Sequence, residues 1–430
     1  MAILSPFAAV RPVPELAERV AALPYDVMNS EEAREMVKGN PYSFLHVDKA
    51  EIDLDPSVDL YSSEVYAKAA ENLKKMEEEG TYIRDSKPCF YIYRQIMNGR
   101  AQTGLVGCTS IDDYLNNNIK KHELTRAEKE ADRIRHVDIC DANTGPIFLT
   151  YRAQAEISAR MNSWKKEHAP VYDFVAEDGI GHAVWVVDDE ATVAYFAEAF
   201  AHVPALYIAD GHHRAASAVR VGQKRREQYP EYTGEEEFNY FLAVLFPDEE
   251  LSIWDYNRVV KDLNGYTEEE YLAKVAEAFE VCPAAECNQQ TEAATCDKNS
   301  GKHYAKPVEK HTFGMYLGGK WYSLKAKAGS FDEADPVGQL DVSILQKNLL
   351  TPILGIGDPR VDKRIDFIGG IRGLEELERL VDGGMAVAFA MYPTTVDDLM
   401  GIADTGNIRP PKSTWFEPKL RSGIFVHKLS

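Results

Sequence analysis

No run of about 18 apolar residues occurs in the sequence, although a helix needs that length to cross a bilayer. The first 14 residues also lack a basic segment followed by a long apolar stretch, so no secretory signal is predicted. We therefore expect a cytoplasmic protein with no membrane partner.

Cysteine is scarce, with 6 in 430 residues and no Cys-x-x-Cys pair. Cysteines scattered in this way favour reduced thiols over a disulfide framework. One polar stretch holds three of them and a histidine, with spacings that match none of the usual zinc-binding pairs: Cys282, Cys287, Cys296 and His303. The sequence thus predicts no zinc site there, and it leaves metal ligands unknown.

Basic residues are outnumbered, with 48 Lys and Arg against 69 Asp and Glu, which gives a net charge of −21. Such a surface repels the phosphates of nucleic acids and anionic lipids, because binding to DNA depends on their neutralisation by Lys and Arg. Nucleic acid is therefore not an expected partner. The hydrophobic content of 45% is that of an ordinary globular protein.

A Gly-x-x-x-x-Gly pattern is also missing before Lys412, Ser413 and Thr414, so this sequence does not form a P-loop. Prolines in the surrounding range 409–419 predict an extended chain. One hypothesis is an arm that places the lysine and the two hydroxyls against a phosphate or a carboxylate. The alternative is an ordered strand that packs the two following aromatic residues into the core.

The stretch with the strongest chemical signal is Asp210, Gly211, His212, His213 and Arg214. A short apolar run precedes it and a small, helix-prone segment follows, which predicts a strand, a tight turn and a helix. Glycine permits the turn, and the unpaired N–H groups at a helix start bind anions. Arginine adds a planar fork for phosphate oxygens, and histidines transfer protons or bind metals. These residues are predicted to hold a phosphate, the alternative being a solvated helix start.

His122 and Glu123 stand just before a second predicted helix, next to two lysines. A glutamate in that position can serve as a general base for a hydroxyl or as a magnesium ligand, while lysines neutralise phosphate. We predict a catalytic role for both residues. On the helix that follows, Lys129, Arg133 and His136 share one face, a pattern typical of a solvated or salt-bridged surface.

The order of elements predicts an α+β protein with mixed sheets and hairpins. Two hairpins are expected, one around Asn98-Gly99 and one around Gly318-Gly319. Helices and strands do not alternate regularly over the first 150 residues. We expect three units, over residues 1–151, 152–265 and 266–430.

The strand, the turn at residues 210–214 and the alanine-rich helix resemble the phosphate-binding element of the ParB/sulfiredoxin superfamily. ParB-like free-serine kinases have a similar Asp-Gly-His turn. The resemblance implies a ParB/sulfiredoxin-like core over residues 152–265. It also implies ATP or ADP with Mg²⁺ as cofactors.

Five motifs in the same order resemble a large bacterial family filed as a domain of unknown function, often labelled SpoOJ/ParA/ParB/RepB-like. They are Leu23-Pro24-Tyr25-Asp26-Val27, Asn40-Pro41-Tyr42, His122-Glu123-x-Thr125, the turn at 210–214, and Pro410-Pro411-Lys412-Ser413-Thr414-x-Phe416-x-Pro418-Lys419. The family usually has a second proline at the position of Leu23. This resemblance brings no established reaction.

Taken together, the superfamily resemblance implies nucleotide-dependent phosphoryl transfer to a small hydroxylated metabolite, with free serine as one candidate. Two alternatives stay open from the sequence. One is a nucleotide-binding regulatory or partition-type module without catalysis, and the other is a metal-dependent hydrolase that uses Asp210, His212 and His213. The sequence does not specify the oligomeric state.

Overall fold

The computed structural model describes residues 2–123, 125, 127–285, 295–296 and 303–430. The chain forms two compact units, Met1–Leu251 with Pro418–Ser430 and Ser252–Glu417. Both units mix helices with sheets, in keeping with the α+β class expected from the sequence. The expected range 1–151 and residues 152–251 of the next range instead form one unit, because their strands pair within a single sheet, whereas residues 252–265 belong to the second unit.

The first unit is built on a nine-stranded sheet with the order β6-β11-β8-β12-β5-β4-β10-β9, in which β1 also pairs with β5. Two pairs are parallel, β11 with β6 and β12 with β8, and the other pairs are antiparallel. The strands are β1 (Leu4–Ser5), β4 (Phe90–Met97), β5 (Arg100–Ser110), β6 (Ile119–Lys120), β8 (Ile147–Tyr151), β9 (Tyr172–Val175), β10 (Gly181–Val187), β11 (Leu206–Asp210) and β12 (Tyr240–Pro247).

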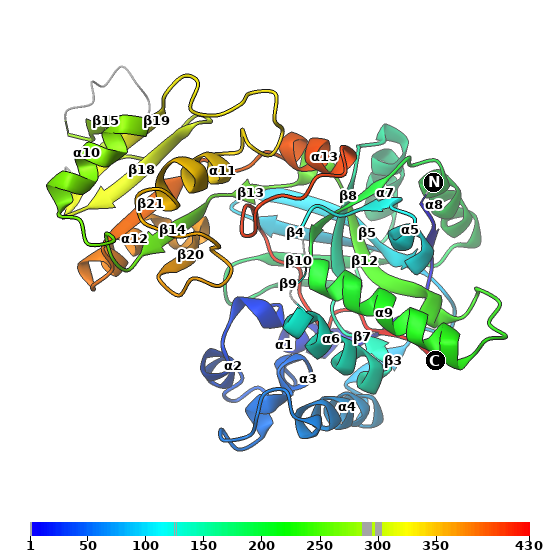
Figure 1. Cartoon of the computed structure of the whole chain (residues 1–430). Helices are drawn as coiled ribbons and strands as arrows, with labels where there is room; N and C mark the ends of the chain where they lie inside the picture. Colours follow the sequence, from blue (N-terminus) through cyan, green and yellow to red (C-terminus); the bar gives the residue numbers. More distant parts are fainter. Residues whose placement is uncertain (1, 124, 126, 286–294, 297–302) are drawn as a thin grey trace. The chain divides into compact units, whose positions relative to one another are not determined.

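Helix α9 packs on this sheet through its small side chains Ala215, Ala218 and Val219, and it lies beside α6 (Figure 1). The helices are α1 (Ala17–Val20), α2 (Ser30–Met36), α3 (Leu45–Asp48), α4 (Ser63–Glu78), α5 (Ile111–Leu115), α6 (Ala127–Cys140), α7 (Ala155–Glu167), α8 (Glu190–Ala201) and α9 (His212–Gln228). Short 3₁₀ helices are η1 (Pro14–Leu16), η2 (Tyr25–Val27), η3 (Ala50–Asp53), η4 (Glu237–Asn239) and η5 (Asp248–Glu250). Two small ribbons pair β2 (Val10–Pro12) with β3 (Tyr82–Arg84) and β7 (Ala142–Asn143) with β23 (His427–Lys428).

The second unit has a six-stranded sheet with the order β15-β19-β18-β21-β14-β20. Its strands are β14 (Tyr256–Val260), β15 (Phe279–Pro283), β18 (Thr312–Leu317), β19 (Lys320–Ala326), β20 (Ile365–Gly369) and β21 (Val387–Met391). Its helical segments are α10 (Glu268–Ala278), α11 (Asp341–Leu345), the π-helix η6 (Gln346–Leu350), η7 (Gly370–Arg372), α12 (Gly373–Asp382) and α13 (Val396–Asp404). Two ribbons pair β13 (Ile253–Trp254) with β22 (Trp415–Phe416) and β16 (Thr295–Cys296) with β17 (His303–Tyr304).

Both predicted hairpins are present. Asn98 and Gly99 have φ values of 51° and 78°, and Gly318 and Gly319 have 55° and 78°. Positive φ at both central residues is the signature of the type I′ turn, which matches the twist of the flanking strands.

Three cysteines are free and buried, namely Cys89, Cys108 and Cys140. Cys282 is disulfide-bonded, so the prediction of reduced thiols is wrong at this position. Cys287, which belongs to the polar stretch considered for zinc, lies outside the described residues.

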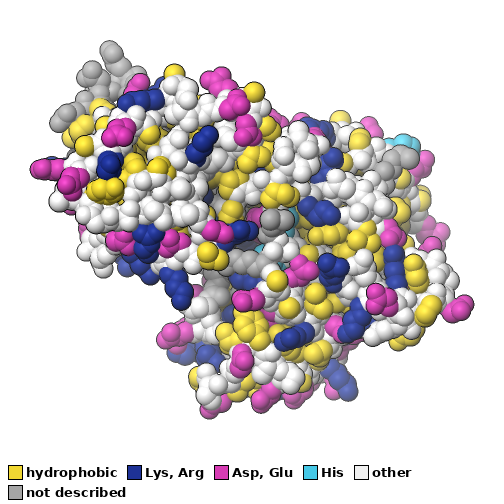
Figure 2. All heavy atoms as spheres, viewed as in Figure 1, with side chains coloured by type: hydrophobic (Ala, Val, Ile, Leu, Met, Phe, Trp, Pro, Cys, Tyr) yellow, Lys and Arg dark blue, Asp and Glu magenta, His cyan; other side chains and the backbone are white. Residues whose placement is uncertain are grey.

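Within the described part of the chain, no helix combines the length and the apolar character needed to cross a membrane. Figure 2 shows acidic and basic side chains intermixed over the face in view. The net charge of −21 is therefore not gathered into one acidic patch on this face.

Gly222, in the middle of α9, makes the closest approach between this helix and its neighbours. A Cβ atom there would lie 2.6 Å from the carbonyl oxygen of Phe238 and 2.7 Å from Cδ1 of Ile111. We expect Gly222→Ala to lower the free energy of unfolding of the first unit by about 1–3 kcal/mol, the usual cost of overpacking. Urea denaturation followed by circular dichroism measures this change.

Gly401→Ala in α13 is the matched control. A Cβ atom at Gly401 would meet no described atom within 4 Å. Alanine is the better helix former by about 0.5–1 kcal/mol, so the stability of the second unit should rise slightly. Equal losses in the two variants would contradict the close approach at Gly222.

Candidate functional site

Two predicted motifs meet because the strands that precede them are neighbours. Strand β11 pairs in parallel with β6, with Leu206 opposite Ile119. The carboxyl ends of parallel strands lie at the same edge of a sheet, so the segments that follow both strands emerge together. His122 and His212 accordingly lie in contact, with ring centroids 4.6 Å apart in an edge-to-face arrangement. Both histidines are buried.

Gly211 forms the turn that joins β11 to α9. Its φ of +93° is accessible to glycine at little cost, which explains the residue type. The N-cap residue, Gly211, has no side chain that could cap the first turn of α9. Instead Arg214 folds back, so that a Cβ atom on Gly211 would lie 3.1 Å from its Nε atom. The turn is half-buried, and the Arg214 guanidinium covers it.

Asp210 lies between two cations. Its Oδ2 atom is 3.3 Å from Nζ of Lys419 and 3.8 Å from Nη2 of Arg214. Burial acts to raise the pKa of Asp210, but Lys419 and Arg214 outweigh it and hold the pKa well below its ordinary value. The cluster of Asp210, Arg214 and Lys419 carries one net positive charge. Lys419 belongs to the carboxyl-terminal motif, and no sequence pattern predicted its contact with Asp210.

His213 and Glu123 are the remaining predicted site residues of this region. His213 is half-buried, and its carbonyl accepts a hydrogen bond from Ser217 Oγ at 2.6 Å. Glu123 is half-buried in the segment between β6 and α6. The predicted catalytic segment at 122–123 and the predicted phosphate-binding turn are thus joined through the two histidine rings.

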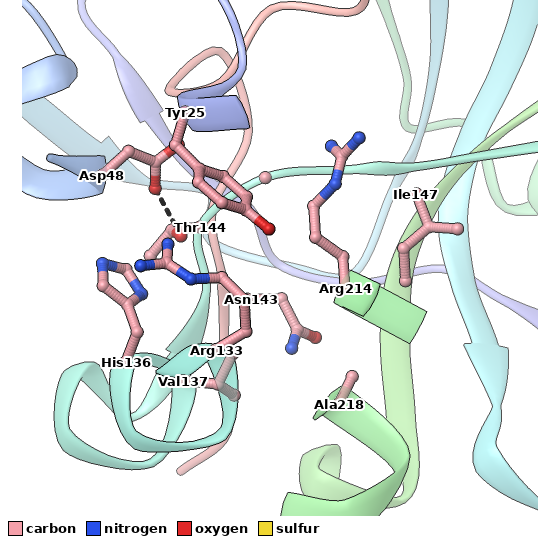
Figure 3. Close-up of a pocket in the computed structure, with 11 residues that line it drawn as sticks. Tyr25, Asp48, Arg133, His136, Val137, Asn143, Thr144, Ile147, Arg214 and Ala218 are labelled. Atoms are coloured by element: carbon pink, nitrogen blue, oxygen red, sulfur yellow. Dashed lines mark hydrogen bonds between the residues drawn. The ribbon is translucent and has the colours of Figure 1, made fainter. Parts of the chain in front are cut away.

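A narrow cavity of about 20 Å³ lies beside Arg214 (Figure 3). That volume accommodates one or two water molecules, so a phosphate group enters it only if a wall side chain moves. Its wall comes from five separate segments of the first unit: Tyr25, Asp48, Arg133, His136, Val137, Asn143, Thr144, Gly145, Ile147, Arg214 and Ala218. Tyr25 belongs to the first family motif, so that motif and the turn line the same cavity.

Arg133 forms the centre of the opposite wall. Its guanidinium carbon lies 4.1 Å from the centroid of the Tyr25 ring, a cation–π contact, and its Nε atom donates to Asp132 at 2.8 Å. The sequence predicted a solvated or salt-bridged surface at Lys129, Arg133 and His136. Arg133 does form an ion pair, with Asp132, but Arg133 and His136 are buried and not at the surface, because α6 packs against α4 and the residues before it.

His136 is fixed by the backbone. Its Nε2 atom lies 3.1 Å from the carbonyl oxygen of Val47, which can only accept, so Nε2 carries a proton. Burial, followed by the positive charge of Arg133, lowers the pKa of His136 below its ordinary value of 6.5. The neutral ring therefore presents Nδ1 as an acceptor.

A second, wider cavity of about 200 Å³ adjoins the first. The two cavities share Tyr25, Asp48, Arg133 and His136. The wider one is lined in addition by polar side chains of α4, α6 and the first family motif, including Asp26, Tyr66 and Asp132. Such a wall can hold a small ligand with both donor and acceptor groups.

Lys412, Ser413 and Thr414 belong to the second unit. Lys412 is exposed and has a φ of +58°. The hydroxyls of Ser413 and Thr414 accept from the two terminal nitrogens of Arg409, at 3.0 and 3.2 Å. The two aromatic residues that follow form β22, so the alternative of an ordered strand is confirmed.

Metal ligands were left open by the sequence. Among the residues that the structure describes, no three His, Cys, Asp or Glu side chains are close enough together to hold a metal ion. The cations Lys419 and Arg214 neutralise Asp210 instead.

The model of a protein family of unknown function, DUF1015, matches residues 4–343. No curated protein matches the sequence. The matched range includes Tyr25, Arg133 and the turn at residues 210–214, but it ends before the motif at 410–419.

Several solved structures are similar to this chain at low identity. A free serine kinase in complex with AMP is 13% identical, with a TM-score of 0.36, over 78% of this chain and 92% of that chain. A conserved hypothetical protein from Pyrococcus furiosus is 14% identical, with a TM-score of 0.33, over 74% and 92%. SbnI with a C-terminal truncation, from Staphylococcus aureus, is 11% identical, with a TM-score of 0.37, over 74% and 85%. At these TM-scores the likeness says nothing about individual residues.

The neutral state of His136 predicts a pH dependence of stability. As the pH falls below about 6.5, the unfolded chain binds a proton that folded His136 does not bind, so the free energy of unfolding falls. The loss reaches at most about 1.4 kcal/mol per pH unit and ends at the pKa of the folded state. His136→Gln keeps a donor for Val47 and should reduce this slope between pH 7 and 5 in urea denaturation. Identical slopes in the two proteins would show that His136 titrates normally.

Proposed function

This chain belongs to the DUF1015 family of proteins of unknown function, and we propose that it transfers a phosphoryl group from a nucleotide to a small hydroxylated metabolite. The observation that carries the proposal is the cationic cluster at the start of α9. Arg214 and Lys419 together outweigh Asp210 at the N-terminal end of α9. Phosphoryl transfer depends mostly on positioning and on neutralising charge, which this cluster supplies.

Arg214 is the residue that meets the phosphate. In the structure its Nη1 atom donates to the carbonyl oxygen of Pro146 at 2.6 Å. This bond uses one of its five N–H donors, and the guanidinium borders the narrow cavity. We propose that Arg214 turns from Gly211 toward the phosphate, which widens the cavity and uncovers the amides of His212 and His213.

The acceptor hydroxyl needs a base. Glu123, or His122 through its contact with His212, takes the hydroxyl proton while the hydroxyl oxygen bonds to the terminal phosphorus of the nucleotide and the bond to the leaving phosphate breaks. ATP or ADP is the donor implied by the sequence resemblance, and Mg²⁺ accompanies the phosphates. Free serine is a candidate acceptor.

The role of Lys412, Ser413 and Thr414 stays a hypothesis. Because Arg409 already holds the two hydroxyls, binding of a phosphate to them would replace those bonds. Lys412 is exposed, and its Nζ atom lies 5.5 Å from the centroid of the Tyr256 ring.

A nucleotide-binding regulatory module without catalysis uses the same turn and is the second candidate. The same observation supports it, because a cationic cluster binds phosphates whether or not a transfer follows. Consumption of the nucleotide only in the presence of a hydroxylated substrate distinguishes the two. The hypothesis of a metal-dependent hydrolase has less support, because the Asp210 carboxylate is paired with Lys419 and Arg214.

Arg214→Lys should weaken nucleotide binding about tenfold or more, because lysine keeps the charge but lacks the fork that holds two phosphate oxygens. Isothermal titration of ATP and ADP with Mg²⁺ measures the change. Arg220→Ala on the same helix is the control, since its exposed side chain does not line the cavities. Unchanged affinity in Arg214→Lys, or no nucleotide binding by the unaltered protein, would refute the proposed site.

Glu123→Gln should reduce the rate of phosphoryl transfer about 10²–10⁴-fold, the usual contribution of a general base, and leave nucleotide affinity unchanged. The assay follows phosphate transfer to serine, threonine and small sugars. If the loss appears in His122→Asn and not in Glu123→Gln, the base is His122. Full activity in both variants would exclude this segment as the source of the base.

A further inference from the structure

The wider cavity contains a buried carboxylate, Asp48, that forms no ion pair with a described residue, although it interacts electrostatically with Arg133. Asp48, at the end of α3, is 4% exposed and lines both cavities. Its Oδ1 atom accepts a hydrogen bond from the Thr144 hydroxyl at 2.8 Å (Figure 3). Among the described residues, Asp48 has no ion pair, and no donor is bound to its Oδ2 atom. Burying a carboxylate without a paired cation is energetically costly, so Asp48 is suited to bind a cationic group of a ligand.

Asp26 is exposed, and the other two acids of the cavity already have partners. Glu51 accepts from Lys49 at 3.0 Å and from Ser30 at 2.7 Å. Asp132 accepts from Tyr66 at 2.8 Å and from Arg133 at 2.8 Å. Asp48 is therefore the buried acid with capacity left for a ligand.

Arg133 places a positively charged guanidinium in the same cavity wall. Only its Nε atom donates to a described residue, and its ring contact with Tyr25 fixes the plane of the guanidinium. The two terminal nitrogens keep their donors, in the geometry that binds a carboxylate through two parallel hydrogen bonds. A wall with one unneutralised carboxylate and one guanidinium fork matches a molecule that carries an ammonium and a carboxylate together.

We infer that this cavity binds the head group of an α-amino acid, with Asp48 on the ammonium and Arg133 on the carboxylate. Its volume of about 200 Å³ accommodates a small ligand. Its border with the narrow cavity, which Arg214 lines, directs the side chain of the ligand toward the turn. The inference rests on the proposed function in one respect: the bound amino acid is the phosphoryl acceptor of the proposed reaction. Binding of the amino acid itself requires no nucleotide.

The first test uses the unaltered full chain and ligands that differ by one group. Isothermal titration with each common amino acid identifies the tightest ligand, serine being the first probe. Its decarboxylated and deaminated analogues are expected to bind about tenfold or more weakly, because each lacks one charged hydrogen-bond partner. If the amino acid is serine, these analogues are ethanolamine and 3-hydroxypropionate. An analogue that binds as tightly as the amino acid, or no binding of any amino acid at millimolar concentration, overturns the inference.

Two variants assign the groups. Asp48→Asn keeps an acceptor for Thr144 and should weaken the binding of the amino acid about tenfold or more. The affinity for the deaminated analogue, which has no ammonium, should not change. Arg133→Lys should weaken the binding of the amino acid and of the deaminated analogue, which carry the carboxylate. It should leave the affinity for the decarboxylated analogue unchanged. Asp55→Asn, at an exposed carboxylate outside the cavity, is the control. Should Asp48→Asn fail to fold, the comparison of ligands on the unaltered protein decides alone.

The two proposals fail separately. Nucleotide binding without amino-acid binding would overturn the head-group site and leave the turn as a nucleotide site. Amino-acid binding that depends on Asp48, without any nucleotide binding, would support the head-group site and overturn the kinase proposal.

Discussion

The interaction of Asp210 with Lys419 and Arg214 holds the candidate site together. Lys419 lies 209 residues further along the chain, yet its ammonium is 3.3 Å from the carboxylate at the end of β11. Removing one partner of such a partly buried cluster leaves an uncompensated charge, which costs far more than the pair itself contributes. The segment 418–430 is fixed to the first unit at further points, including the hydrogen bond from Gln95 to the carbonyl of Lys419 and the pairing of Val10 with Val426.

The same arrangement explains why the site is cationic in a strongly acidic protein. The overall charge of the chain is −21, whereas the cluster of Asp210, Arg214 and Lys419 carries one net positive charge. A small anion responds to the charges within a Debye length, about 8–10 Å, rather than to the sum over the chain. Local and overall charge therefore lead to different conclusions about partners.

Helix α6 is where the expectations from the sequence and the structure diverge most. Charged residues three and four positions apart indicate one face of a helix, and such a face is usually solvated. Here the face lies under Tyr25 and beside Val47, so Arg133 and His136 are buried. The three-residue period could not reveal this, because the covering residues come from a segment about one hundred positions earlier.

The sequence by itself determined the local elements. The turn at Gly211, the hairpins at Asn98-Gly99 and Gly318-Gly319, and the start of α9 follow from the φ values that glycine and asparagine permit and from short-range periodicity. The tertiary structure alone decided that the strands of residues 1–151 and 152–251 share one sheet, that Lys419 meets Asp210, and that Asp48 and Arg133 line one cavity. The physical reason is that backbone preferences act over a few residues, whereas strand pairing and the partners of buried charges join segments that only the complete fold brings together.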